Sequence, residues 1–471
     1  MERNVDVAII GAGTAGLAAV SQVRQATKTF VLINGGELGT TCARVGCMPS
    51  KALIQVGHDL HRRELFEREG IEGGEGLSAN LPDILEHVRD LRDILVDRVL
   101  GNSTDQMEDE FLDGYARFVA PGVLQVGDDV VYAKSIIIAC GTRPMVPPAW
   151  ADFGDRILTS DSLFEQEDLP HAVAVVGLGI IGLEIGQALA QLGISVTGID
   201  QQETIAGIAD PSSRQSAIEV MSRAFPLWLG CPAELQEEEG RIRISAGERT
   251  VVVDKVLAAM GRRSNLDWLS VENAGVELDD QGIPVFDSTT MRCGETRVFI
   301  AGDITGTDQI LHEAATEGRI AGYNASRGES IAFARKTPLA ITFTSPNICS
   351  VGVAFDDLNP EEIETGEMRL GPVGRALLMG ANRGIIRLYA EKKSGVLLGA
   401  TVVAERGEHL AHLLAWAIDE RMTVLQLARK PFYHPTMEEA VQGALRDLLQ
   451  KLKPSTNPPD APPDLGALNR T

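Results

Sequence analysis

Short apolar runs alternate with longer amphipathic stretches along most of this chain, a pattern that predicts strands separated by helices. The first run, Val5 to Ile10, has the character of a buried parallel strand, and a helix is expected from Leu17 to Gln25. The order returns later, with a strand at 172–176, a helix at 183–192 and a strand at 195–199. Repeated units of this kind predict an α/β fold with doubly wound, three-layer parallel sheets.

A longer helix is predicted within the first quarter of the chain. Residues 81–106 repeat apolar side chains at steps of three and four among charged ones, which predicts a long amphipathic helix after a glycine-rich break at 71–76. Strands are expected at 118–126 and 130–139. Histidines 58, 61 and 87 fall in the helical stretch, and we expect them on the surface.

From Pro338 the sequence becomes richer in strands, which predicts a C-terminal α+β domain. Its expected elements are strands at 341–346, 384–389 and 396–403 and helices at 409–419 and 436–452. Residues 454–471 contain five prolines and are expected to form a disordered tail.

Composition narrows the class of protein. A chain of 471 residues is too long for one core and predicts three or four domains. The net charge of −23 argues against nucleic acid or an anionic membrane as a partner. No run of 18 apolar residues is present, and six cysteines in so long a chain are not a secreted disulfide framework. A cytoplasmic enzyme that binds no structural metal is expected.

Two glycine motifs follow predicted strands. In Gly11-Ala12-Gly13-Thr14-Ala15-Gly16 the glycines allow a tight turn, close approach of a pyrophosphate, and helix packing. The motif returns at 177–182, so two Rossmann-like units and two dinucleotides are expected. The strand after the first motif ends at Asn34, an uncharged ribose ligand, and the strand after the second ends at Asp200. A carboxylate there repels a 2′-phosphate and no arginine follows, which favours NAD over NADP.

Cys42 and Cys47 lie about one βαβ unit after the first motif, where the chain should enter a helix. A helix N-terminus favours a thiolate, and a pair at this spacing can close a disulfide across one turn. Two buried small side chains or half of a zinc site are the alternatives, although no second Cys/His pair has ligand spacing.

Five further segments of the chain contribute to a resemblance with a known family. They are 136–144, 261–265, 297–303, 310–318 and 432–439. Together with the glycine and cysteine motifs, they resemble the FAD-dependent pyridine nucleotide-disulfide oxidoreductases, the group that contains dihydrolipoamide dehydrogenase, glutathione reductase and mercuric reductase. The resemblance covers residues 4–453.

The resemblance implies a division into domains. It places an FAD-binding domain with the redox disulfide at 1–147, an NAD-binding domain at 148–268, a central segment that completes the FAD site at 269–337 and an interface or dimerisation domain at 338–453. The implied FAD contacts are Gly11, Gly13, Gly16, Asn34, Thr41, Lys51, Ala116, Gly141, Asp303 and His312. The implied NAD contacts are Gly177, Gly179, Gly182, Asp200 and Gly261.

The family's catalytic residues also have counterparts. They are Cys42, Cys47, Lys51, Glu184, His434 and Glu439. By resemblance, Cys42 exchanges with the substrate, the Cys47 thiolate faces the flavin, and Lys51 pairs with Glu184. His434 serves as the base, held by Glu439, and it comes from the opposite subunit, which implies a homodimer.

Within the family, the resemblance implies oxidation of dihydrolipoamide on a lipoyl-bearing carrier protein, with NAD⁺ as acceptor. No cysteine lies beyond Cys349, whereas mercuric reductases use a C-terminal thiol pair, and Asp200 disfavours a glutathione reductase. A disulfide reductase using NAD(P)H with another substrate, or a low-turnover redox-sensing or scaffold flavoprotein, stays as an alternative. Six positions depart from the family pattern, at Asn34, Thr40, Arg44, Cys140, Ser264 and Phe432. Arg44 is expected to affect partner choice or thiol pKa, and Cys140 to be buried and without redox function.

Overall fold

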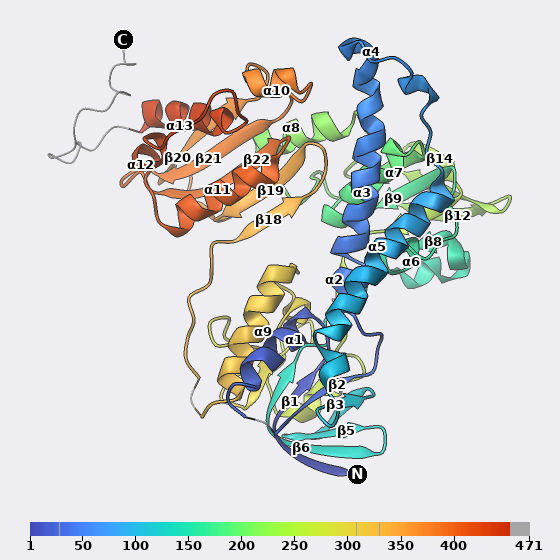
Figure 1. Cartoon of the computed structure of the whole chain (residues 1–471), viewed down its shortest axis with the longest axis vertical. Helices are drawn as coiled ribbons and strands as arrows, with labels where there is room; N and C mark the ends of the chain where they lie inside the picture. The colour runs from blue at the N-terminus through green and yellow to red at the C-terminus, as the bar shows by residue number, and fades with distance from the viewer. Residues whose placement is uncertain (28, 308, 329, 453–471) are drawn as a thin grey trace.

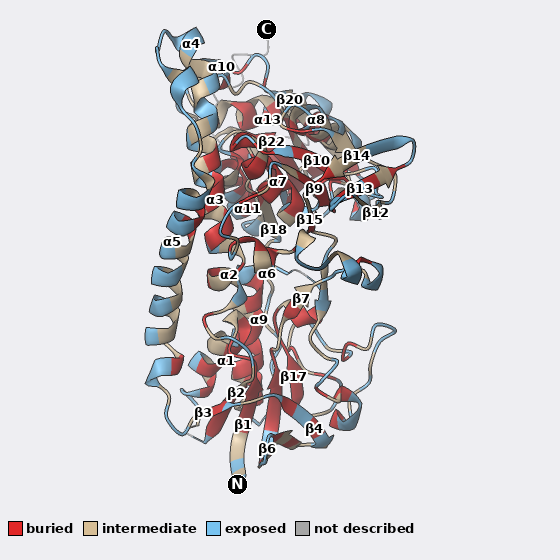
Figure 2. Cartoon of the chain, turned by 90° about the vertical axis from the view of Figure 1, so that its right-hand side faces the viewer, coloured by how far each residue is buried: buried red, intermediate tan, exposed pale blue. Residues whose placement is uncertain are grey.

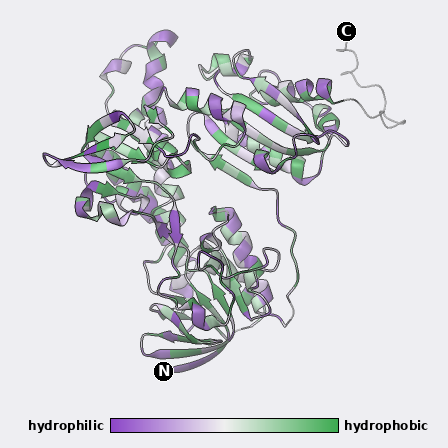
Figure 3. Cartoon of the chain, turned by 180° about the vertical axis from the view of Figure 1, so that it is seen from behind, coloured by the Kyte–Doolittle hydropathy of each residue, from purple (hydrophilic) through white to green (hydrophobic). Residues whose placement is uncertain are grey.

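The computed structural model describes residues 1–27, 29–307, 309–328 and 330–452. Three larger sheets organise these residues, and Figure 1 shows them as three bodies, with the N-terminus at the far end of the first. Figure 2 shows that buried residues concentrate in their strands, and Figure 3 shows the same strands as the apolar parts of the chain. The expected tail at 454–471 lies outside the described residues.

The first sheet is built around β1 (Glu2–Ile10), which pairs in parallel with a neighbour on each side. Val7 and Ile9 belong to one core and Ala8 and Ile10 to the other, as the two-residue period of a strand requires. Its other strands are β2 (Phe30–Asn34), β3 (Phe111–Asp113), β4 (Ala116–Ala120), β5 (Val123–Val126), β6 (Asp129–Ile138) and β17 (Val298–Ile300). Helices α1 (Thr14–Val23) and α9 (Leu311–Ala325) pack together on it.

The second sheet is parallel and has the order β11-β10-β9-β15-β8. Its strands are β8 (Ile157–Leu158), β9 (Ala172–Val176), β10 (Ser195–Ile199), β11 (Leu227–Trp228) and β15 (Lys255–Ala258). Helices α6 (Ser160–Leu163), α7 (Ile180–Gln191) and α8 (Pro211–Met221) belong to this part. Two small antiparallel sheets accompany it, β12 (Glu234–Glu238) with β13 (Arg241–Ala246) and β14 (Arg249–Val253), and β7 (Thr142–Pro144) with β16 (Arg262–Ser264).

A group of helices joins the two parallel sheets. It consists of α2 (Thr41–Arg44), α3 (Cys47–His61), α4 (Phe66–Glu69) and α5 (Leu81–Gly101). Helix α3 packs between α5 and α7, so the first turn of α3 lies where the two parallel domains meet (Figure 1).

The C-terminal sheet is antiparallel, with the order β18-β19-β22-β21-β20. Its strands are β18 (Leu339–Thr342), β19 (Asn347–Gly352), β20 (Ile363–Arg369), β21 (Ile385–Glu391) and β22 (Leu397–Ala404). Its helices are α10 (Gly374–Leu378), α11 (Gly407–Asp419), α12 (Val424–Ala428) and α13 (Glu439–Lys451). An extended connection, described over residues 330–338, leads to it from the end of α9 (Figure 1).

The predicted α/β fold class is confirmed, and β9 and β10 have the predicted bounds. The strand expected at 118–126 was wrong, because the chain turns at Pro121-Gly122 and forms the hairpin of β4 and β5. Gly122 supplies the positive φ of +76° that this turn needs. The surface position expected for His58 was also wrong, since the residue is partly buried beside α7 and its Nε2 atom is fully buried. The predicted domain limits stay predictions.

Candidate active site

The two cysteines of the predicted redox pair face each other where α2 gives way to α3. Cys42 lies in α2 and Cys47 is the first residue of α3. Gly46 separates the helices, and a Cβ there would lie 2.9 Å from the Thr41 carbonyl oxygen. The absence of that Cβ lets the two short segments approach, and the helix N-terminus brings its free N–H groups to Cys47.

Both cysteines are free thiols in this structure, and each changes the acidity of the other. A hydrogen bond from the Cys42 thiol and the charge of Lys51 together lower the pKa of Cys47 to about 7, against the opposing effect of burial. The same hydrogen bond, with burial, raises the pKa of Cys42. The pair therefore holds one thiolate, and it is on Cys47.

Lys51 and Glu184, which are 133 positions apart, meet beside this pair with Nζ and Oε2 2.7 Å apart. Glu184 is buried, and its Oε1 accepts a hydrogen bond of 2.8 Å from the Phe343 N–H. The Lys51 ammonium lies 4.8 Å from the centre of the Phe343 ring. Phe343, just after β18, thus contacts both members of the ion pair.

A cavity of about 310 Å³ lies in front of the thiols. It is enclosed by the first turn of α1, the α2–α3 junction, the first turns of α7 and α9, and the end of β18. Its lining includes Gly13, Thr14, Thr41, Cys42, Cys47, Lys51, Gly141, Ile180, Glu184, Arg262, Asp303, Leu311, Ile341 and Phe343. The described residues that line it come from three bodies of the fold, all within one chain.

The two glycine motifs have the same local geometry. A Cβ at Gly11 or Gly177 would lie 2.3 Å from a carbonyl oxygen of the neighbouring strand end, and both have φ near +100°. A Cβ at Gly13 or Gly179 would meet no atom within 4 Å. Open space at the middle glycine, at a helix N-terminus, fits a pyrophosphate that approaches the backbone. The residues present therefore fit two dinucleotides, one at each motif.

Asn34 and Asp200 occupy matching places in these units. Asn34 Oδ1 accepts a 3.0 Å hydrogen bond from Ala12 N–H, and Asp200 Oδ2 accepts one of 2.6 Å from Leu178 N–H. Asp200 Oδ1 also accepts from Gln202 N–H at 2.8 Å. Each side chain thus orders the glycine loop of its own unit, and only the second carries a negative charge.

Asp303 faces the cavity from the loop that follows β17. Burial raises the pKa of its carboxyl, while the charge of Arg262 and a hydrogen bond from Thr142 oppose that rise. Arg262 is itself held by Thr142, with bonds of 2.9 Å to the hydroxyl and carbonyl oxygens. An anionic side chain is thereby fixed at the cavity wall.

The predicted acid-base pair lies in the C-terminal domain. His434 Nδ1 and Glu439 Oε1 are 2.9 Å apart, and Glu439 Oε2 accepts from Thr436 N–H at 3.2 Å. The contact with His434 lowers the pKa of Glu439. The His434 side chain is 78% exposed and does not line the cavity of its own chain. Most of the His434 side chain is thus open to a group supplied from outside this chain.

Five further residues were predicted to contact a cofactor, and each has a defined place in the fold. Gly16 and Gly182 lie in the first turns of α1 and α7, and a Cβ there would lie within 2 Å of the Gly11 or Gly177 oxygen. Gly261 has φ +109° and precedes Arg262. Ala116 is buried in β4, and His312 is half exposed near Glu313; neither lines the cavity. Their contacts with a cofactor stay predictions.

The sequence reasoning missed three residues that the structure places here. Arg262 was not predicted as a site residue, although the sequence shows a cation directly after a glycine in the 261–265 segment. Phe343 carried no local signal. Gln187, one turn after Glu184, was also missed; its amide makes bonds of 2.7 and 2.8 Å to both backbone groups of Ser345.

The departures from the family pattern have local explanations. The Arg44 guanidinium pairs with Glu37, while the largest effects on the pKa of Cys47 come from Cys42, burial and Lys51. Thr40 has φ +65° and ψ 147°, a conformation that favours glycine, and its hydroxyl caps α2 through Ala43 N–H. Burial raises the pKa of Cys140 to about 12, and its thiol contacts the Asn265 carbonyl oxygen.

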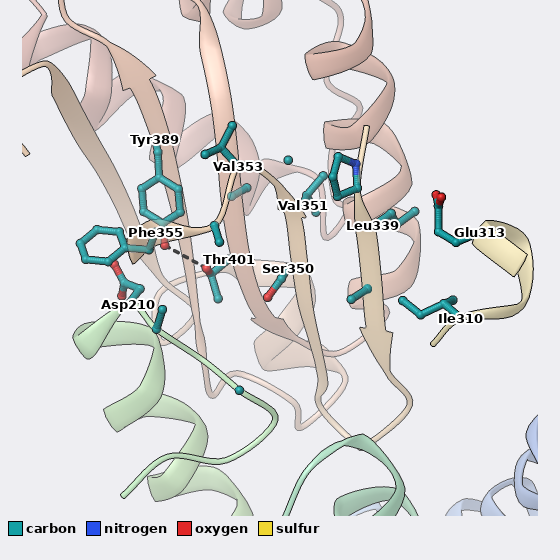
Figure 4. Close-up of a pocket in the computed structure, with 17 residues that line it drawn as sticks. Asp210, Ile310, Glu313, Leu339, Ser350, Val351, Val353, Phe355, Tyr389 and Thr401 are labelled. Atoms are coloured by element: carbon teal, nitrogen blue, oxygen red, sulfur yellow. Dashed lines mark hydrogen bonds between the residues drawn. The ribbon is translucent and has the colours of Figure 1, made fainter. Parts of the chain in front are cut away.

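A smaller cavity of about 190 Å³ lies on the open face of the C-terminal sheet (Figure 4). Two carboxylates at its edge are already engaged, Asp210 by Arg387 and Glu313 by Arg335. The Tyr389 and Thr401 hydroxyls bond to each other at 2.9 Å. This cavity therefore offers no unpaired carboxylate among its labelled residues.

Comparison with known proteins agrees with this geometry. Residues 5–318 match the family described as pyridine nucleotide-disulphide oxidoreductase, and residues 339–445 match its dimerisation domain. A dihydrolipoyl dehydrogenase of Halobacterium salinarum is 30% identical over 95% of this chain and 97% of its own length. A mercuric reductase of Shigella flexneri is 31% identical over 95% of this chain and 81% of its own length.

Solved structures give the same fold. LpdA of Mycobacterium tuberculosis superposes with a TM-score of 0.81 at 25% identity and covers 94% of this chain and 99% of its own. The HOCl-induced flavoprotein disulfide reductase RclA of Escherichia coli has a TM-score of 0.79 at 21% identity, covering 95% of this chain and all of its own. In the part of the chain that is described, no helix is both long and apolar enough to cross a bilayer.

Proposed function

The chain belongs to the pyridine nucleotide-disulphide oxidoreductase family, whose members use FAD and NAD(P)H, and we propose that it oxidises protein-bound dihydrolipoamide and reduces NAD⁺. The observation that carries this proposal is the His434–Glu439 pair. A dithiol substrate must lose protons as it is oxidised, and an exposed imidazole held by a carboxylate is suited to take them near pH 7.

The chemistry of the cysteine pair follows from its acidity. A substrate thiolate attacks the Cys42 sulfur of the Cys42–Cys47 disulfide, and Cys47 leaves as the thiolate that its surroundings favour. The second substrate thiol then attacks its own sulfur in the mixed disulfide, which releases the cyclic disulfide product and frees Cys42. His434 takes one of the two substrate protons, and the other passes to Cys42, whose raised pKa favours the thiol. Two electrons reach the cysteine pair, and the substrate leaves oxidised.

FAD bound in the cavity supplies the acceptor for those two electrons and the hydride for NAD⁺. Around it, Lys51 and Glu184 keep a fixed charge pair beside the Cys47 sulfur, and Asp303 and Arg262 form the polar wall. Phe343 and Ile341 cover the apolar side and exclude water. The protein thus provides orientation and electrostatics, as cofactor enzymes do.

Asp200 supports NAD as the second dinucleotide. Its carboxylate is held by two backbone N–H groups at the end of β10, where it can accept hydrogen bonds from a ribose and would repel a 2′-phosphate. We expect kcat/KM for NADH to exceed that for NADPH by at least about tenfold. A preference for NADPH would contradict this assignment.

The same proposal includes a homodimer. His434 lies outside the cavity of its own chain, and the family's dimerisation domain spans the region that carries it. A base supplied by the partner would complete each site, so that a single chain would be inactive.

The deciding experiment compares substrates with the purified holoenzyme. Formation of NADH is followed with free dihydrolipoamide and with separate lipoylated carrier domains, and consumption of NADH and NADPH with oxidised glutathione and with Hg²⁺. The proposal expects turnover with dihydrolipoamide and faster turnover with one carrier. Faster turnover of glutathione disulfide would favour the disulfide reductase alternative, and Hg²⁺-dependent turnover a mercuric reductase.

A second measurement tests the low-turnover alternative. Anaerobic titration with NADH should produce a long-wavelength absorbance band from the Cys47 thiolate beside oxidised flavin, and Cys47→Ser should remove it. If no band forms in the unaltered protein, the catalytic proposal fails and a sensing or scaffold protein is favoured.

A further inference from the structure

A buried charge network lies behind the predicted FAD site and takes no part in the thiol chemistry. Glu313 and Glu317 lie one turn apart on α9, with 7% and 2% of their surfaces exposed. Arg335, on the connection that leads to β18, places Nη2 2.6 Å from Glu313 Oε2 and 3.1 Å from Glu317 Oε1. One guanidinium therefore serves two buried carboxylates.

The other oxygen of Glu317 reaches the loop that lines the cavity. Glu317 Oε2 accepts a hydrogen bond of 2.8 Å from Gly302 N–H. Gly302 has φ +86°, and a Cβ there would lie 2.8 Å from the Cβ of Ala15, so the loop rests directly on α1. The next residue is Asp303, whose carboxylate faces the cavity. Glu317 thus sets the backbone that carries Asp303.

The helix that bears both carboxylates is itself closely packed. A Cβ at Gly318 would lie 2.1 Å from the Ala15 carbonyl oxygen, and one at Gly322 2.5 Å from that of Ala19. Helix α9 therefore cannot shift without moving α1, which opens the first glycine motif. Arg335 reaches this rigid unit from the connection, where Phe333 N–H also bonds to the Thr289 carbonyl oxygen at 2.9 Å.

The positive charge of Arg335 stabilises the ionised form of the buried Glu317. Burial raises the pKa of Glu317, and the hydrogen bonds from Gly302 and Arg335 oppose that rise, while the charge of Glu313 adds to it. Without the guanidinium, two buried carboxylates one turn apart would keep only the half-exposed His312 ring, 3.6 Å from Glu313, as a nearby basic group among the described residues, an unfavourable arrangement. Glu317 would then take a proton or turn away from Gly302.

We propose that Arg335 is a positioning residue for the flavin, which keeps Glu317 aligned on Gly302 and thereby holds Asp303 at the cavity wall. The affinity for FAD then depends on the docking of the connection between α9 and β18. This inference rests on the use of FAD in the proposed function and does not depend on dihydrolipoamide as the substrate.

The test compares Arg335→Gln and Arg335→Lys with the control Arg327→Gln. Arg327 lies near the same connection, but its guanidinium stacks on Tyr323 and bonds to the Tyr323 carbonyl oxygen. Each apoprotein is titrated with FAD, and flavin fluorescence, the visible spectrum and the midpoint potential are recorded. We expect Arg335→Gln to weaken FAD binding by about tenfold or more, Arg335→Lys to restore most of it, and Arg327→Gln to bind normally.

Two results would overturn the proposal. Arg335→Gln could bind FAD with unaltered affinity and potential, or Arg327→Gln could lose as much affinity, which would show a general effect of loosening the connection. Where Arg335→Gln alone does not fold, Glu317→Gln is compared with the Glu317→Gln/Arg335→Gln double variant instead. In a Glu317→Gln background, the neutral amide still accepts from Gly302, so adding Arg335→Gln should cost little; a further loss of FAD affinity of about tenfold or more would contradict the mechanism. Loss of dihydrolipoamide turnover with normal FAD binding would refute only the proposed function.

Discussion

At the scale of single residues, the sulfur of Cys47 is kept negatively charged by a hydrogen bond from Cys42 and by the ammonium of Lys51. Both effects lower the pKa of Cys47 to about 7, so the thiolate is present above pH 7 and lost as the pH falls through 7. The same residues that shape the cavity thus also set the protonation of the reacting group.

Replacing Lys51 by Met should raise the pKa of Cys47 toward the ordinary value of a thiol, because one of its two stabilising neighbours is lost. The measurement is thiolate absorbance in the ultraviolet against pH, in reduced protein freed of flavin. Lys255→Met is the control, since Lys255 bonds to Gln166 in another part of the fold. An unchanged titration midpoint in Lys51→Met would contradict the assignment.

His434→Gln should lower kcat for dihydrolipoamide by about 10²–10⁴-fold, the range of a lost general base. Glu439→Gln should lower it less and shift the pH profile, because the ring stays but its orienting carboxylate is gone. Steady-state kinetics across pH 6–9 measure both, and His87→Gln on the exposed side of α5 is the control. Wild-type rates in His434→Gln would remove this residue from the mechanism.

Thr40 permits a test of backbone strain. Its φ of +65° with ψ of 147° costs on the order of 1–3 kcal/mol for a residue with a Cβ. Thr40→Gly should therefore stabilise the protein, while Thr40→Ala should destabilise it, since the alanine keeps the strain and loses the cap on Ala43. Chemical denaturation of the three proteins decides; a less stable Thr40→Gly variant would mean that the cap outweighs the strain.

At the scale of elements, the two strand-turn-helix units, β1 with α1 and β9 with α7, have nearly the same local structure. The strand, the glycine turn and the helix lie within about 25 residues, so their geometry follows from local sequence and was predictable. The hairpin of β4 and β5 was missed even though Pro121-Gly122 is a turn signal, because the apolar run around it was taken as one strand.

Substitutions at the middle glycines, Gly13 and Gly179, should impair dinucleotide binding without impairing folding. A Cβ at Gly13 or Gly179 has room in the protein itself, but a side chain there would occupy the path of a pyrophosphate. Gly13→Val should abolish FAD binding, and Gly179→Val should abolish NADH binding while FAD is retained, each with little loss of thermal stability in the apoprotein.

Gly16→Ala provides the contrast, because its Cβ would lie 1.8 Å from the Gly11 oxygen and should destabilise the fold itself. FAD fluorescence titration, NADH titration and thermal melts distinguish the cases. Retention of NADH by Gly179→Val would show that this loop does not hold the pyrophosphate.

At the scale of the whole molecule, one chain brings together the thiols, the Lys51–Glu184 pair and the cavity, while His434 stays apart on the C-terminal domain. If the partner supplies the base, two inactive variants should complement each other. Cys42→Ser and His434→Gln chains, mixed and allowed to exchange subunits, should regain about a quarter of full activity, because half of random dimers carry one complete site of two.

The alternative predicts a different result. A base supplied within the same chain would leave every site in the mixture without either Cys42 or His434, and no activity would return. Separately treated homodimers of each variant, mixed only at assay, are the control. Failure to recover activity after proven subunit exchange would contradict the shared site.

The sequence alone determined the local chemistry of this protein. The spacing of Cys42 and Cys47, the glycine motifs and the five-residue step from His434 to Glu439 place groups within one or two turns, where backbone geometry leaves little choice. Only the tertiary structure decided which distant groups meet them. The contacts of Phe343 with Glu184 and of Arg335 with Glu317, and the path of Arg262 to the cavity wall, depend on how three sheets pack, and no short-range pattern encodes that packing.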